Sequence, residues 1–192
     1  MVGVVMAQVQ EAWKRGVIAG ALLMDVAAAF PSVARGCLLR KMRNAGVDEC
    51  LVRWTGSFMQ GRKVVMSVDG QEGEMSVTTG LPQGSPVSPV LFALYIAEIY
   101  QAVDQVDDCR GISFVDDVTW VVEGHNVDEV ANKLDRSTQA SLGWAQDNAV
   151  RFKTAKTEAI LFLPEAQALG TARGGSRSAT RSSGSRQRPP GG

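Results

Sequence analysis

The chain has 192 residues, 45% of them hydrophobic, which is typical of one globular domain with or without a tail. The formal net charge is zero, but residues 1–167 carry 15 Lys and Arg against 20 Asp and Glu, whereas residues 168–192 carry five Arg and no acid. Three cysteines without metal-ligand or disulfide spacing exclude a zinc module and a disulfide framework, and indicate an intracellular protein, nuclear or cytoplasmic. The sequence shows no secretory signal and no apolar run of the ~18 residues that a membrane span requires.

The first third of the chain predicts a buried strand among helices. Residues 2–15 have apolar side chains at helical spacing, and further helices are expected at residues 33–45 and 48–59. Residues 21–26 form a continuous apolar run that predicts a strand ending at Asp25. The elements expected after residue 60 are hairpin strands at 63–68 and 74–78, a helix at 87–103, hairpin strands at 111–115 and 118–122, a helix at 126–149, and short strands at 150–153 and 158–163.

Three local signals concern packing and chain reversal rather than chemistry. Residues 69–70, Asp-Gly, predict the turn of the first hairpin. Asn126, with Glu129 three residues later, predicts a capped start for the long helix. Trp54 and Phe58 are expected in the core rather than on a binding surface.

Asp25 is the first candidate functional residue. An acid at the end of a buried strand has few structural explanations, and capping the next helix is the main one, because Asp favours N-cap positions. Ser32, which follows Pro31, is better placed to cap that helix. Helix capping is therefore a poor explanation for Asp25, and a functional role is favoured.

Residues 80–89, GLPQGSPVSP, form a second unusual stretch. Their glycines and prolines force a defined loop before an apolar helix. A plain connector is the alternative, but it would need neither so many constrained positions nor the polar Gln83 between them. Glycines in such a loop typically allow the backbone to lie close to a ligand.

Asp116 and Asp117 are adjacent carboxylates inside the apolar run from Ile112 to Val122. A buried carboxylate must be paired, hydrogen-bonded or metal-bound. The flanking β-branched and aromatic residues predict a hairpin whose two-residue turn is Asp116-Asp117, with both carboxylates at its tip. Acidic oxygen ligands on a rigid support suit a hard divalent cation such as Mg²⁺. An ordinary surface hairpin with an acidic turn is the alternative, which this stretch alone does not exclude.

The order of the expected elements, β-α-α-β-β-α-β-β-α-β, predicts an α+β fold. In one antiparallel sheet the strand end at Asp25 and the hairpin with Asp116 and Asp117 can be neighbours, so we expect the three carboxylates to converge at one edge, flanked by helices 33–45 and 126–149. Two-metal phosphoryl chemistry needs this arrangement, in which acids hold two ions ~3.5–4 Å apart.

Together these stretches resemble the palm segment of a reverse transcriptase, most closely of the non-LTR (LINE-type) retrotransposon group. LLMDVAAAFPSV resembles the family's first palm motif, GLPQGSPVSP its second, Phe-Val-Asp-Asp at 114–117 its third, and Lys-Thr-Glu at 156–158 its fourth. The resemblance covers about residues 5–163. It implies a polymerase palm, an antiparallel sheet with a catalytic Asp-Asp hairpin packed on helices.

The resemblance implies catalytic roles for four residues. Asp25 and Asp116 correspond to metal ligands, with Asp117 as the supporting acid. Lys156 corresponds to a lysine that donates a proton to the leaving pyrophosphate or neutralises it, although an ordinary surface lysine is the alternative.

It also implies substrate contacts. Phe30 matches the bulky residue that excludes a ribose 2′-OH and so selects deoxynucleotides. Gln83 and Gly84 would contact the nucleotide, and Pro82 and Ser85 the template and primer. The expected cofactors are two Mg²⁺ ions, with Mn²⁺ possible, and the expected partners are an RNA template, a DNA primer and a dNTP, with no membrane.

The expected organisation is a partial palm domain over residues 1–165 and a disordered Gly/Ser/Arg/Pro-rich tail over residues 166–192. The family's fingers, thumb and endonuclease regions are expected to be largely absent, so the chain should be weak or inactive alone. Pro31 departs from the family pattern, in which an Asp commonly follows the first-motif Phe. The competing hypotheses are an inactive truncated remnant, a weak RNA-binding fragment, and a small acidic binding module with a chance Asp-Asp hairpin.

Overall fold

A four-stranded antiparallel sheet forms the centre of the protein, seen in a computed structural model that describes residues 2–164. The strand order is β4-β5-β1-β6, with the two apolar strands β1 and β5 in the middle. The expected tail at 166–192 lies outside the described residues. The strands are β1 (Ile18–Asp25), β4 (Cys109–Phe114), β5 (Asp117–Gly124) and β6 (Glu158–Phe162), and a separate hairpin contains β2 (Arg62–Val68) and β3 (Gln71–Val77).

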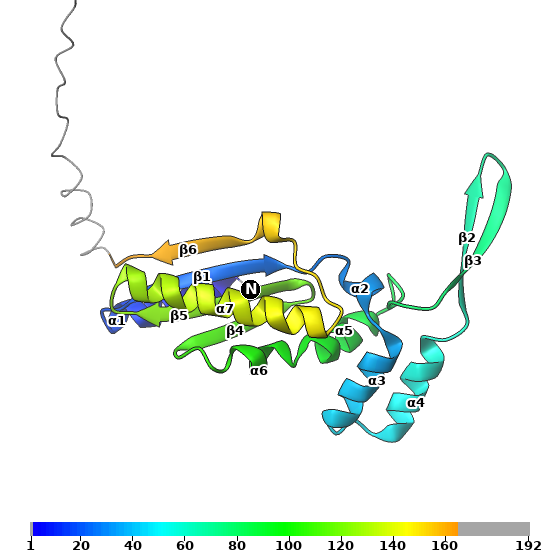
Figure 1. Ribbon diagram of the computed structural model, residues 1–192, viewed down its shortest axis with the longest axis horizontal. Helices are drawn as coiled ribbons and strands as arrows, with labels where there is room; N and C mark the ends of the chain where they lie inside the picture. Colours follow the sequence, from blue (N-terminus) through cyan, green and yellow to red (C-terminus); the bar gives the residue numbers. More distant parts are fainter. Residues whose placement is uncertain (1, 165–192) are drawn as a thin grey trace, which may run out of the picture.

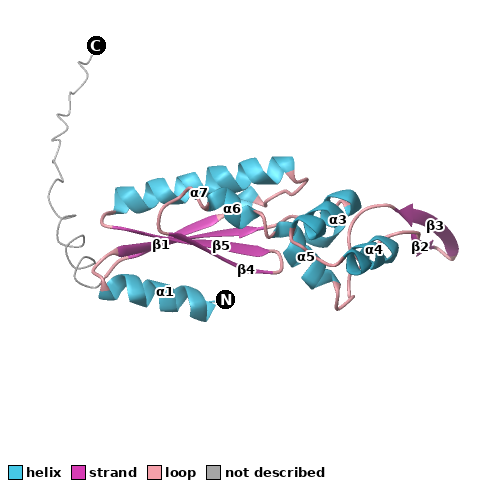
Figure 2. Cartoon of the chain, turned by 90° about the horizontal axis from the view of Figure 1, so that it is seen from below, coloured by secondary structure: helices cyan, strands magenta, loops and turns pink. Residues whose placement is uncertain are grey.

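Helices cover both faces of the sheet (Figures 1 and 2). One face packs against α7 (Val127–Asp147), and α1 (Val2–Lys14) lies on the opposite face. The approach of α7 to β1 depends on Gly20, because a Cβ atom there would lie 2.5 Å from Cγ1 of Val130. The mixed helical and antiparallel architecture confirms the predicted α+β class. No helix within residues 2–164 is both long and apolar enough to cross a membrane.

The chain that follows β1 differs from the expected single helix at 33–45. It forms a short helix α2 (Ala29–Ser32) and then α3 (Arg35–Asn44), whose N-cap residue Ala34 offers no side-chain cap. The predicted cap at Ser32 is wrong, since its hydroxyl instead donates to the carbonyl of Ala29 at 2.9 Å. The predicted position of this helix beside the carboxylates is also wrong, because α3 packs against α4 (Glu49–Phe58) and α5 (Ser88–Ile96).

Lys41 connects α3 to the rest of the core. Its side chain is 1% exposed, and its Nζ atom lies 2.9 Å from the carbonyl oxygen of Tyr95 and 2.9 Å from a carboxylate oxygen of Glu98. The ammonium group also lies 4.6 Å from the ring centroid of Trp144 and 5.0 Å from that of Tyr95. These contacts satisfy a charge that would otherwise be costly to bury.

Two of the local predictions agree with the structure, at the turn of the first hairpin and at the start of α7, and two do not. Residues 69–70 form the hairpin turn with φ of 52° and 77°, as the primed turns of Asp-Gly require. The amide of Glu129 donates to Oδ1 of Asn126 at 2.8 Å, which confirms the cap of α7. Trp54 was expected in the core but is 49% exposed and stacks on Phe58 with 5.2 Å between ring centroids, so that prediction is wrong. The predicted helix at 87–103 is divided into α5 and α6 (Ile99–Val103).

Candidate active site

The turn between β4 and β5 consists of Val115 and Asp116, not of the predicted Asp116 and Asp117. Phe114 ends β4 and pairs with Asp117, the first residue of β5. The shift of one residue requires a φ of 57° at Val115, a left-handed conformation that β-branched residues rarely adopt. Asp117 is therefore held in a strand, while Asp116 belongs to the turn.

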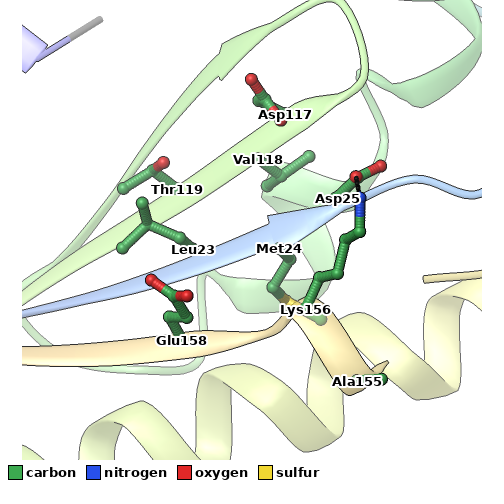
Figure 3. Close-up of a pocket in the computed structure, with 9 residues that line it drawn as sticks. All are labelled: Leu23, Met24, Asp25, Asp117, Val118, Thr119, Ala155, Lys156 and Glu158. Atoms are coloured by element: carbon green, nitrogen blue, oxygen red, sulfur yellow. Dashed lines mark ion pairs between the residues drawn. The ribbon is translucent and has the colours of Figure 1, made fainter. Parts of the chain in front are cut away.

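Asp25 and Asp117 lie directly opposite each other on the central strands β1 and β5. Cross-strand partners point to the same face of a sheet, so these two carboxylates are neighbours. Both line a cavity of about 460 Å³, together with Thr119 and Lys156 (Figure 3). The amide of Val26 continues the pairing beyond Asp25 by donating to the carbonyl of Asp116 at 2.9 Å. The hairpin tip is thus fixed to the end of β1.

Asp116 is placed less favourably for binding a metal ion than Asp25 and Asp117. It lies half-buried in the turn and is not among the residues that line the cavity. Within residues 2–164, no three His, Cys, Asp or Glu side chains stand together in positions that could hold a metal ion. The structure therefore brings Asp25 and Asp117 together, whereas the expected convergence of all three carboxylates is not present. The carboxylate oxygens still suit a hard divalent cation in their chemistry.

Two lysines approach Asp25, and the nearer one was not predicted. Nζ of Lys153 lies 2.9 Å from Oδ1 and 3.0 Å from Oδ2 of Asp25. Lys156, the predicted lysine, ends a short 3₁₀ helix (Thr154–Lys156), and its Nζ lies 4.0 Å from Oδ2 of Asp25 (Figure 3). An ammonium group against Asp25 shows that a cation fits beside this carboxylate.

Lys153 reaches Asp25 because the segment before β6 is attached to the end of β1. The amide of Lys153 donates to the carbonyl of Asp25 at 2.8 Å, and Phe152 forms a bridge with Val26. The strand predicted at 150–153 is therefore a single bridge. No local sequence signal marks this pairing, because the two segments are more than a hundred residues apart.

The loop at residues 80–89 is bound to α2, which joins the predicted first and second motifs. The amide of Leu81 donates to the carbonyl of Phe30 at 2.8 Å, and the amide of Gly80 donates to that of Val33 at 2.8 Å. Gly80 has a φ of 81°, and a Cβ atom there would lie 2.8 Å from Cα of Pro31. Glycine is required at this position both for its backbone conformation and for the close contact.

The predicted substrate residues surround this loop rather than the carboxylate cavity. Pro82 and Gln83 line a second cavity of about 500 Å³, next to Arg62 and Lys63. The ring of Phe30 is half-buried and packs edge-on against Phe92, with 5.8 Å between the centroids.

The two remaining loop residues have clear backbone roles. Gly84 is exposed, has a φ of 82°, and leaves open space around the position of a Cβ. Ser85 lies at the entry to α5, where its carbonyl accepts a hydrogen bond from the amide of Ser88 at 3.2 Å. The structure places neither residue in the carboxylate cavity.

The sheet, its aspartate hairpin and the helices on its faces define a palm-like polymerase fold. Solved structures of similar fold include telomerase of Candida tropicalis, with a TM-score of 0.62, 13% identity, and coverage of 84% of this chain and 32% of that one. A second structure, a form truncated from its C-terminal domain, has a TM-score of 0.61 at 12% identity over 81% of this chain and 34% of that chain.

The sequence itself gives the family. The family model described as "Reverse transcriptase (RNA-dependent DNA polymerase)" matches residues 4–182, and the chain belongs to this family. Enzymes of this family generally use divalent metal ions.

Two curated relatives come from non-LTR retrotransposons. The RNA-directed DNA polymerase from mobile element jockey of Drosophila funebris is 25% identical over 157 residues, which are 79% of this chain and 17% of the relative. A putative 115 kDa protein in the type-1 retrotransposable element R1DM of Drosophila melanogaster is 25% identical over 139 residues, 72% of this chain and 13% of the relative. The chain thus spans less than a fifth of the length of either relative.

Proposed function

We propose that this chain forms the palm of an RNA-directed DNA polymerase of a non-LTR retrotransposon. In the reaction, the 3′-OH of a DNA primer paired to an RNA template attacks the α-phosphorus of a dNTP, and pyrophosphate leaves. The observation that carries the proposal is the cross-strand pairing of Asp25 with Asp117 at a cavity, one residue from the Val115–Asp116 turn. The family membership supplies the reaction class that this site would perform.

Asp25 and Asp117, which lie opposite each other at the cavity, would hold Mg²⁺, or Mn²⁺ in its place, with Asp116 in the adjacent turn. Bound metal would activate the attacking oxygen and stabilise the leaving group. The chain contributes rigidity to this site, since Asp25 and Asp117 belong to the two central strands of the sheet. Lys156 lines the same cavity with a side chain that is 68% exposed, and its Nζ lies 4.0 Å from Oδ2 of Asp25, so its ammonium would neutralise a pyrophosphate leaving beside this carboxylate or donate a proton to it.

The loop at 80–89 and α2 would hold the nucleotide and the template. Phe30 is fixed by its packing on Phe92 and by the backbone bond from Leu81, so its ring can act as a rigid wall against a 2′-OH. Gln83 and the exposed Gly84 would contact the nucleotide.

Pro82 and Ser85 would contact the template and the primer. The cavity beside Pro82 is also lined by Arg62 and Lys63, and cationic side chains at this place suit the phosphates of a nucleic-acid strand. These residues support the inference that the partners are an RNA template and a DNA primer.

Primer extension on an RNA template tests the proposal directly. The 192-residue chain should extend a DNA primer slowly with Mg²⁺ or Mn²⁺, because it spans only a small part of its relatives. Asp25→Asn and Asp117→Asn should abolish that extension. The matched control is Asp135→Asn, which changes the same functional group on the exposed surface of α7 and should extend like the wild type.

The outcome that would contradict the proposal is extension that survives both Asp25→Asn and Asp117→Asn. The source of the activity would then lie outside this site. Phe30→Ala gives a second check, since loss of the ring should increase incorporation of ribonucleotides relative to deoxynucleotides.

A further inference from the structure

Lys153 forms an ion pair with the carboxylate of Asp25, and this ion pair has no part in the proposed reaction. One ammonium group engages both carboxylate oxygens, at 2.9 and 3.0 Å. Lys156 is the other cation at this carboxylate, but it lies 4.0 Å from one oxygen and its side chain is far more exposed, 68% against 39% for Lys153. Among residues 2–164, Asp25 therefore has one direct cationic partner and one more distant one.

The backbone fixes Lys153 in this position. Its amide donates to the carbonyl of Asp25 itself, and the neighbouring amide of Ala27 donates to the carbonyl of Arg151 at 2.7 Å. The ammonium of Lys153 thus contacts the carboxylate of Asp25 while the backbone of Lys153 is hydrogen-bonded to the backbone of Asp25. Only the lysine side chain must be ordered to form the pair, which lowers the entropic cost of the contact.

We propose that Lys153 occupies the cation position of the carboxylate site and is displaced when a divalent cation binds Asp25, so that this lysine sets the metal affinity. The inference rests on the proposed function, which makes Asp25 a metal ligand. Oxygen ligands stand about 2.0–2.6 Å from such a cation. The ammonium of Lys153 contacts both oxygens of Asp25, so a cation bound to either oxygen would lie close to it.

The two positive charges would repel each other strongly at that separation. The side chain of Asp25 is only 23% exposed, so water screens the repulsion incompletely. Lys153 must therefore leave for the metal to bind. It competes with the metal for Asp25, and it is not itself a ligand.

Mn²⁺ binding to the full 192-residue chain tests this inference, with the electron paramagnetic resonance signal of free Mn²⁺ as the readout. Lys153→Met should raise the Mn²⁺ affinity about five-fold, which corresponds to the loss of one partly exposed ion pair. Lys156→Met removes the same charge at a greater distance and should raise the affinity less than about two-fold. Lys153→Arg retains the cation and should bind like the wild type.

A second readout is the rise in melting temperature caused by Mn²⁺, which should follow the same order because ligand binding stabilises the native state. Lys153→Gln serves as a second variant in case Lys153→Met does not fold, since its amide can still donate to Asp25. An unchanged affinity in Lys153→Gln and Lys153→Met would overturn the inference. So would an equal gain in Lys153→Met and Lys156→Met, because that result would show a general charge effect.

Asp25→Asn separates this inference from the proposed function. If Asp25→Asn loses Mn²⁺ binding while the Lys153 variants bind like the wild type, the metal site stands and the displacement of Lys153 is refuted. If Asp25→Asn binds Mn²⁺ like the wild type, the metal site of the proposed function is itself refuted. Loss of binding in Asp25→Asn together with a gain in Lys153→Met supports both.

Discussion

Gly80→Ala should destabilise the protein much more than Gly84→Ala, although both glycines belong to one loop and have φ near 80°. At Gly84 a new Cβ meets no atom within 4 Å, so the cost is the left-handed conformation alone, about 1 kcal/mol. At Gly80 the Cβ would lie 2.8 Å from Cα of Pro31 and 2.9 Å from the carbonyl oxygen of Phe30. These are backbone atoms, which cannot rotate away, so overpacking adds about 1–3 kcal/mol.

Urea unfolding of the two variants measures this difference. With a slope of about 2 kcal/mol per molar urea, the midpoint should fall by about 0.5 M for Gly84→Ala and by about 1–2 M for Gly80→Ala. The backbone bond from Leu81 to Phe30 should be strained first, because it joins the two segments that must separate. Equal midpoints for the two variants would refute the reasoning, since the penalty would then come only from φ.

Two further predictions concern the ionic contacts of the helices. Lys41→Met keeps most of the buried side chain but removes the ammonium that contacts the carbonyl of Tyr95 and the carboxylate of Glu98. The free energy of unfolding, measured in urea, should therefore fall by about 2–3 kcal/mol. A variant as stable as the wild type would show that burying the charge has no net benefit. The pKa of Glu129 is held below its ordinary value of 4.5, first by the backbone amide of His125 and then by Lys133. Because the folded pKa is depressed, the stabilising effect is present above the unfolded pKa and is lost as the pH falls through the folded one. Glu129→Gln should therefore lower the melting temperature at pH 7, and the gap from the wild type should close as the pH falls below 4.5; a gap independent of pH would contradict this assignment.

Features that depend on neighbours in the sequence could be predicted well. The cap of α7 by Asn126 requires only the two residues and their spacing of three, and the turn at residues 69–70 requires only that Asp-Gly tolerate positive φ. The end of β1 at Asp25 follows from the apolar run before it. In each case the sequence contains both interacting partners within a few positions.

Features that depend on distant segments could not be predicted. The φ of 57° at Val115 contradicts the local preference of a β-branched residue, so the turn was placed one residue too late. The contact of Lys153 with Asp25 joins residues 128 positions apart, and nothing near Lys153 in the sequence marks it. Trp54 has a large apolar side chain, but it lies on the exposed face of α4. The opposite face of this helix, with Val52 and Thr55, is buried, so about half of Trp54 is exposed.

The hairpin of β2 and β3 extends from the body as a separate arm (Figure 1), and the guanidinium of Arg62 closes its base by donating to the carbonyls of Thr79 at 2.9 Å and Gly80 at 2.5 Å. The residues between Arg62 and Val77 are therefore attached to the body through the contacts of Arg62, which also hold the loop beside α2. We therefore expect that a longer or shorter arm would leave the geometry of the two motifs unchanged. Residues 69–70 at its tip are thus a natural insertion point, where an affinity tag, a fluorophore or a whole guest domain can be grafted while the cavity at Asp25 keeps its shape.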